Sequence, residues 1–522
     1  MKNIKYIALA VLAVGFMACE NDTLEDLRDR VNQGEEVLPE LTSGSVDLSN
    51  YVAIGASFTA GYTDGGLFIA SQENSFPNIL SKEFAKVGGG TFTQPLMSDN
   101  SGGILVGGSV ARGYRLTFNP TTSRPESLDT FLTGLGAPVP SITTEAGINI
   151  GSDFNNFGIP GAKSWHLVAP GYAAFNPYYA RIASGPTASV LSDAMNQNPT
   201  FFTLSEVGGN DVLGYALSGG DGTDNITPSD GPPGVGFDQS FGALITTLTS
   251  GGAKGVATNV PYVKDLPHFT TVVYNQLDPN DASIGPLLIP QIPALNAQLY
   301  GPLDAIFTQL GEPDRMNLLS TTEANPLLII DENAEDRSAQ ITGALTPVLG
   351  AQTATAFGFI FGKARQATSD DLIVLSASSA IASIAPGVPA PVNVTGISYP
   401  MPDKWVLTPE EQLEIKEATD AYNVTIKSIT DSNPNVALVD LNSILTELAS
   451  TGIPFGNFTM NANLVTGGAV SLDGFHLTAR GYSYMAYKFL EAIDTSFGSN
   501  FIESGNIPNP GDYPTNYSPT LQ

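Results

Sequence analysis

Four short apolar runs along the chain predict buried β-strands. They cover residues 51–54, 201–204, 255–260 and 436–441. Each run is continuous and does not alternate with polar residues, as expected for strands whose two faces are both covered in a parallel sheet. The pattern therefore predicts a parallel sheet with helices on both sides.

Segments with helical spacing lie between these runs. Thr408, Pro409 and Glu411 mark a helix start, with a capping residue, a proline in the first turn and a glutamate at the capping-box position. The expected buried face of this helix holds Leu413, Ala418, Tyr422 and Ile426. The last helix is expected after Thr478, with an apolar stripe of Tyr482, Met485, Ala486, Phe489, Leu490 and Ile493. Strands that alternate with helices predict an α/β sandwich.

Two stretches interrupt this alternation. Residues 98–150 are rich in Gly, Ser, Thr and Pro, and residues 262–399 hold apolar segments with many small residues. We interpret both as insertions and expect 262–399 to form a cap over the functional site. The tail, residues 496–522, is rich in Pro and Asn and is expected to be irregular.

The N-terminus is typical of an exported lipoprotein. Lys2 and Lys5 precede an apolar stretch, residues 7–18, that is shorter than the roughly 20 residues needed to span a bilayer. Cys19, the only cysteine, follows it, as the acylated cysteine of a bacterial lipoprotein would; the alternative is a buried free cysteine near an ordinary signal. We therefore expect a signal peptide at 1–18, a polar, acidic tether at 19–45, and a lipid anchor at Cys19 in a bacterial outer membrane, with the cell surface as one location.

Composition narrows the partners. The formal charge is −29, and it becomes −31 when the two lysines of the signal are removed. Such an acidic surface repels nucleic acid and anionic headgroups, so we expect no nucleic-acid partner and attachment to the membrane through lipid alone. A single cysteine excludes an intrachain disulfide and a Cys-based zinc site. We expect a monomer with a large core, since 42% of the residues are apolar.

A serine lies where the first strand ends. The segment YVAIGASFTAG places Ser57 after a glycine turn and at a helix N-terminus, which favours developing negative charge nearby. A serine in this position is also a common N-cap, so the segment alone leaves both interpretations open. Two later segments could supply donors for an oxyanion: FNNFGIPGAKSWHL, with Asn156, Gly158 and Gly161, and LSEVGGNDVLG, with Asn210. The alternative for each is an ordinary Gly/Asn turn.

A base for this serine has few candidates, because the chain contains three histidines. Asp473 and His476 are three residues apart before the last helix, so the carboxylate can bind one imidazole nitrogen while the other faces the serine. For His166, packing and substrate contact are equally plausible. His268, in VKDLPHF, is expected to be structural.

These four segments, in this order, resemble the blocks of the SGNH/GDSL hydrolase family over residues 46–261 and 400–495. The resemblance implies a flavodoxin-like three-layer α/β/α fold with a parallel sheet and large insertions. It implies a nucleophile at Ser57, a base at His476 and an orienting carboxylate at Asp473. It also implies an oxyanion hole formed by the Ser57 and Gly161 amides and the Asn210 side chain.

One position departs from the family pattern, because Ala56 stands where the family has an aspartate. That aspartate commonly supports the loop and does not transfer the proton, so the rate or the geometry can differ. The expected activity is hydrolysis of carboxylic esters through an acyl-enzyme, without a metal or cofactor. Phe359, Ile360 and Phe361 suggest a lipid or long-acyl ester, unless they form a local core. The alternatives are a weak or inactive glycan-binding lipoprotein and a polysaccharide deacetylase.

Overall fold

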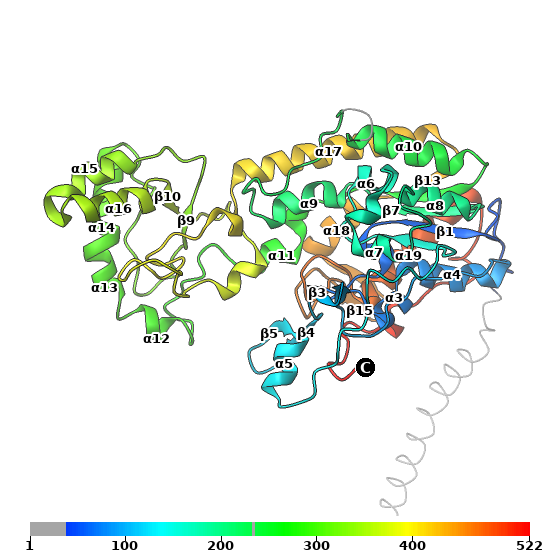
Figure 1. Cartoon of the computed structure of the whole chain (residues 1–522), viewed down its shortest axis with the longest axis horizontal. Helices are drawn as coiled ribbons and strands as arrows, with labels where there is room; N and C mark the ends of the chain where they lie inside the picture. The colour runs from blue at the N-terminus through cyan, green and yellow to red at the C-terminus, as the bar shows by residue number, and fades with distance from the viewer. Residues whose placement is uncertain (1–37, 232–234, 522) are drawn as a thin grey trace, which may run out of the picture.

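Five parallel strands form the centre of the computed structural model, which describes residues 38–231 and 235–521 (Figure 1). Cys19, the signal peptide and most of the tether lie outside the described residues. Across the sheet the strands are β6 (Asn156–Gly158), β1 (Tyr51–Gly55), β7 (Phe201–Ser205), β8 (Lys254–Thr258) and β13 (Val436–Val439). In chain order this is 2-1-3-4-5, and every neighbouring pair is parallel.

Both faces of this sheet are buried because alternate strand residues point to opposite sides. Val52, Ile54 and Phe202 belong to the apolar core on one face, whereas Tyr51 and Phe201 belong to the core on the other. The first core includes residues of α6 (Ser164–Val168), α8 (Val190–Asn196), α9 (Gly209–Leu217), α10 (Phe237–Thr249) and α17 (Pro409–Ser432). The second includes residues of α4 (Phe76–Phe84) and α19 (Ala479–Phe497). The predicted α/β class and parallel sheet are confirmed.

The elements predicted from apolar runs differ from the structure mainly at their ends. The fourth run was expected to continue to residue 441, but Asp440 caps α18 (Leu441–Ser450) by accepting a hydrogen bond from Ser443 N at 3.0 Å. Strand β6 was not predicted, because its three residues are too few to show a hydrophobic pattern. The stripe predicted for α19 is buried throughout. On α17 the prediction was wrong for Leu413, which is 54% exposed, because Ile415 faces the core instead.

The interrupting stretches have their own small elements. Residues 98–150 contain two hairpins and a helix: β2 (Ile104–Val106), β3 (Ser109–Arg112), β4 (Leu116–Asn119), β5 (Arg124–Ser127) and α5 (Leu128–Gly134). In Figure 1 most of the segment 262–399 forms a lobe beside the α/β domain, and α17 leads back from it. The segment begins with α11 (Pro267–Thr270), which lies against the α/β domain because the His268 amide donates to the Gly474 carbonyl at 2.9 Å. The lobe contains α12 (Gly285–Leu288), α13 (Ile292–Leu295), η4 (Asn296–Tyr300), α14 (Gly301–Gln309), β9 (Leu328–Ile330), α15 (Ser338–Leu349), α16 (Ala351–Phe361), β10 (Ala364–Gln366), β11 (Leu372–Ile373) and η5 (Leu375–Ser379).

Shorter elements complete the chain. They are α2 (Ser57–Ala60), α3 (Ile69–Glu73), η1 (Ala85–Val87), η2 (Tyr172–Ala174), α7 (Pro177–Ala180), η3 (Val263–Asp265), η6 (Asp403–Trp405), β12 (Val406–Leu407), β14 (Ile453–Phe455), β15 (Phe458–Met460) and η7 (Pro510–Asp512). The end of the predicted tether is held in place, since Ser45 N donates to Phe497 O at 2.9 Å. The irregular tail is held as well, because its Ser518 carbonyl accepts from Arg115 at 2.7 Å.

Candidate active site

Ser57 lies directly beyond the carboxyl end of β1, as the sequence predicts. It opens the short helix α2 after the buried Ala56, and its own side chain is half-buried. The neighbouring strand β6 approaches this helix closely, since a Cβ added at Gly158 would lie 2.2 Å from the Ala60 nitrogen. Glycine at that position therefore lets the sheet edge support the serine turn directly.

A buried carboxyl group that the sequence reading did not single out supports the same turn. Glu206, the residue after β7, accepts a hydrogen bond from the Phe58 amide at 2.6 Å through Oε1. Burial raises the pKa of Glu206 well above its usual value, although hydrogen bonds from the Phe58, Thr59 and Ala56 amides oppose that shift. The carboxyl thus contacts the turn that contains Ala56. Glu206 lies in the segment LSEVGGND, which was of interest for Asn210. A glutamate in such a segment is normally expected at the surface, so its burial was not predicted.

Asp473 and His476 form the pair predicted from their spacing. Asp473 Oδ2 lies 2.8 Å from His476 Nδ1 and also accepts from the Gly65 amide at 2.8 Å. The other oxygen accepts from the amides of Phe475 and His476 and from the Ser471 hydroxyl, at 2.9–3.0 Å. Burial raises the pKa of Asp473, but the His476 charge and these hydrogen bonds outweigh it and lower the pKa below its usual range. An ionised Asp473 therefore holds the imidazole with its other nitrogen free.

Two further buried groups hold this turn from behind. Asp64 accepts from the Leu472 amide at 3.0 Å, and burial raises its pKa to about 7, with the Asp473 charge adding to the effect. His268 Nδ1 lies 2.9 Å from the Asp473 carbonyl, and burial lowers the pKa of His268. A structural position for His268 was predicted from its segment, whereas Asp64 was missed.

Gly161 and Asn210, two of the three predicted oxyanion donors, follow the strands that flank β1. Gly161 comes after β6 with a φ of +80°, which suits glycine, and Asn210 comes after β7 as the second residue of α9. The Asn210 Nδ2 group donates to the Ala162 carbonyl at 2.9 Å, and its second hydrogen is the one available to a ligand. Since parallel strands end at one edge, β6, β1 and β7 deliver Gly161, Ser57 and Asn210 to the same side of the sheet.

An apolar pocket opens at this edge, and Ser57, Asn210 and His476 line it together. Within the described residues, no hydrogen bond joins Ser57 Oγ to His476. The hydrogen bond between a nucleophile and its base is often long when no substrate is bound. The remaining walls are mainly aliphatic side chains, including Val212, Leu213, Leu445, Leu448, Met460 and Met485.

Other residues singled out in the sequence have structural roles. The Asn156 side-chain amide donates a hydrogen bond to the Thr59 carbonyl at 2.9 Å, so Asn156 supports α2 and is not an oxyanion donor. His166 accepts from the Lys163 amide at 3.0 Å and stacks on Tyr172 at 4.3 Å, and burial lowers its pKa to about 4. The contacts of His166 therefore support a role in packing.

The apolar segment of the predicted cap lies away from this pocket. Phe361 is buried and packs against Phe357 at 5.3 Å, whereas Phe359 is 87% exposed. From the segment 262–399, only Val263 and Leu266 line the pocket. Phe361 thus belongs to a local core of the lobe.

The chain has no significant match to a protein-family model, to a curated protein or to a solved structure. No helix in the described part of the chain is long and apolar enough to cross a membrane.

Proposed function

We propose that this protein is a serine esterase of the SGNH/GDSL type that hydrolyses esters with an extended acyl chain. The observation that carries the proposal is the Asp473–His476 pair, joined at 2.8 Å on the wall of a pocket that Ser57 also lines. The 2-1-3-4-5 order of the sheet supports it, because this is the flavodoxin-like order and ligands bind beyond the carboxyl ends of such strands.

The proposed reaction is acyl transfer to water. His476 accepts the proton of the Ser57 hydroxyl as Oγ attacks the ester carbonyl, and then gives that proton to the leaving alcohol. A water molecule next attacks the acyl-serine with His476 as base, which releases the acid and restores Ser57. The amides of Ser57 and Gly161 and the side chain of Asn210 stabilise the oxyanion, and losing one such donor typically costs about 10²–10³ in rate.

The apolar pocket favours an acyl substrate over the alternatives. Its described walls offer aliphatic side chains from α9, α18 and α19, and few polar groups that could bind sugar hydroxyls. A polysaccharide deacetylase or a glycan-binding protein needs such polar groups. We therefore propose a lipid or long-acyl ester as the substrate class, with Cys19 as the membrane anchor.

The test is hydrolysis of p-nitrophenyl esters by the Ser57→Ala variant. Loss of nearly all activity is expected, since the nucleophile is removed. Ser205→Ala is the matched control, because Ser205 ends the neighbouring strand β7 and is buried without a hydrogen bond from its hydroxyl. Undiminished hydrolysis by Ser57→Ala would remove the mechanism.

A further inference from the structure

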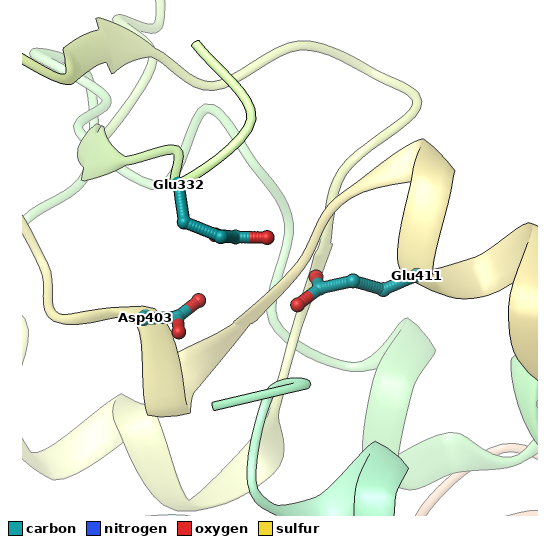
Figure 2. Close-up of side chains that lie close together, drawn as sticks. All are labelled: Glu332, Asp403 and Glu411. Atoms are coloured by element: carbon teal, nitrogen blue, oxygen red, sulfur yellow. The ribbon is translucent and has the colours of Figure 1, made fainter. Parts of the chain in front are cut away.

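Three carboxyl groups from separate segments converge outside the candidate active site (Figure 2). Glu332 follows β9 in the inserted lobe, Asp403 opens η6, and Glu411 lies in the first turn of α17. One oxygen from each lies within 4.8 Å of the others. The three side chains point toward a common space between the lobe and the α/β domain (Figure 2).

Each of these carboxyl groups has a buried oxygen without a hydrogen-bond partner. The three atoms are Glu332 Oε2, Asp403 Oδ1 and Glu411 Oε1. Glu411 is only 4% exposed, and its other oxygen is fixed by the Thr408 amide at 2.7 Å and the Thr408 hydroxyl at 2.8 Å. The capping box therefore orients Glu411 so that its unpartnered oxygen faces the cluster, and buried polar atoms rarely remain unpartnered.

No cation forms an ion pair with the cluster in the described part of the chain. Lys363 Nζ donates to the Glu332 backbone carbonyl at 2.6 Å but forms no ion pair with the Glu332 carboxylate. The acids Asp221 and Asp331 add further negative charge near Asp403. Asp331 is neutralised separately by Arg365 at 2.5 Å. Three acids so close together need either shared protons or a cation.

A glycine turn closes the remaining side. Gly219 and Gly220 follow α9 with φ values of +66° and +74°. A Cβ at Gly220 would lie 1.8 Å from Glu411 Oε1, and one at Gly219 would lie 2.3 Å from the Asp403 carbonyl. The backbone can approach the cluster only because both residues lack side chains.

We propose that Glu332, Asp403 and Glu411 form a Ca²⁺ site that ties the inserted lobe to the α/β domain. Oxygen-only ligands suit a hard divalent cation. Ca²⁺ tolerates irregular geometry and several carboxylates, whereas Mg²⁺ requires a near-octahedral shell and usually keeps most of its water. The role is structural, since the cation joins the lobe to α17 and to the loop after α9.

Protons are expected to compete with the cation. Burial, and then the neighbouring Glu332, raise the pKa of Asp403 to about 7. Burial raises the pKa of Glu411 to about 8, against the hydrogen bonds of Thr408 and with the help of the Glu332 and Asp403 charges. A carboxylate must be ionised to bind a cation, so protons and Ca²⁺ compete for the same oxygens.

The test is calorimetric titration of the metal-stripped mature chain with CaCl₂ at pH 8, together with thermal melts in CaCl₂ and in EDTA. One saturable site is expected. Calcium at about 100 times its Kd should raise the melting temperature by roughly 3 °C if the chain unfolds as one unit. The absence of saturable uptake, together with equal melting in CaCl₂ and EDTA, would leave a proton-sharing cluster and overturn the proposal.

Variants locate the site. Glu411→Gln keeps an acceptor for the capping box but removes the charge, and Glu332→Gln removes the ligand from the lobe; each should weaken Ca²⁺ binding by at least about tenfold. Glu410→Gln, exposed in the same turn of α17, is the matched control and should bind as wild type. In EDTA, Glu332→Gln should melt above wild type, because a like charge is removed. If Glu332→Gln does not fold, Asp403→Asn provides the same readout. Wild-type Ca²⁺ affinity in these ligand variants, or Mg²⁺ binding at least as tight as Ca²⁺, would overturn the assignment.

Discussion

Replacing Glu206 by alanine should slow acylation of Ser57, whereas replacing it by glutamine should change the rate little. Glu206 is 7% exposed, and its Oε1 is the acceptor for the Phe58 amide, one residue after the nucleophile. Burial holds its pKa well above the usual value, which favours the neutral acid. Glutamine has nearly the same shape and keeps a carbonyl acceptor for that amide.

The size of the effect follows from the hydrogen bond that alanine removes. A buried amide left without an acceptor costs about 1–3 kcal/mol. If that cost falls on the reactive arrangement of the serine turn, the rate drops roughly 5- to 150-fold, since each 1.36 kcal/mol is about tenfold. Glutamine should remain within about threefold of wild type, because it leaves the amide paired.

The assay is the rate at which a fluorophosphonate labels Ser57, measured beside kcat for a p-nitrophenyl ester and the melting temperature. Glu83→Ala is the matched control, since Glu83 is buried to a similar degree in α4 but does not touch the serine turn. Wild-type labelling by Glu206→Ala would refute the reasoning. Equal losses for Glu206→Ala and Glu206→Gln, with unchanged melting temperatures, would refute the neutral-acid account.

Three further changes have defined outcomes. Asp473→Asn should lower kcat by roughly 10²–10⁴-fold. The pKa of Asp473 is depressed in the folded state, so the ionised carboxylate stabilises the fold above about pH 4 and this contribution is lost as the pH falls. The melting temperatures of the variant and of wild type should therefore converge in acid. Leu448→Trp should narrow the pocket and lower kcat/KM for p-nitrophenyl decanoate at least about tenfold while sparing the acetate, and equal losses for both esters would contradict the pocket assignment. Asp64→Asn should become more stable relative to wild type as the pH rises from about 4 to about 7, which thermal melts would show. Over this range the unfolded carboxyl ionises, whereas burial holds the native pKa at about 7, so wild type loses stability until Asp64 also ionises in the native state. A difference in melting temperature that stays constant over this range would count against this account.

The sequence predicted the parts of the fold that depend on local pattern. The strands at β1, β7, β8 and β13 are apolar runs because the sheet is covered on both sides, and α19 starts where Thr478 accepts from the Gly481 amide at 3.0 Å. Asp473 and His476 were predictable as a pair because they lie three positions apart in one turn. Local spacing carries this information without any knowledge of distant contacts.

The missed features depend on contacts between distant segments. Glu206 supports the serine turn only because β7 pairs with β1, and no local signal marks an acid as buried. Glu332 meets Glu411 only because the inserted lobe folds back against the start of α17. In each case the chain positions are far apart, and tertiary packing alone brings the groups together.

The most direct measurement for the proposed esterase is fluorophosphonate labelling of the mature chain, followed by peptide mapping. One adduct on Ser57 is expected, with none in Ser57→Ala and much slower labelling in Asp473→Asn, since the base would lose the carboxylate that orients it. No adduct on the folded wild-type chain, or an adduct that persists in Ser57→Ala, would contradict Ser57 as the nucleophile.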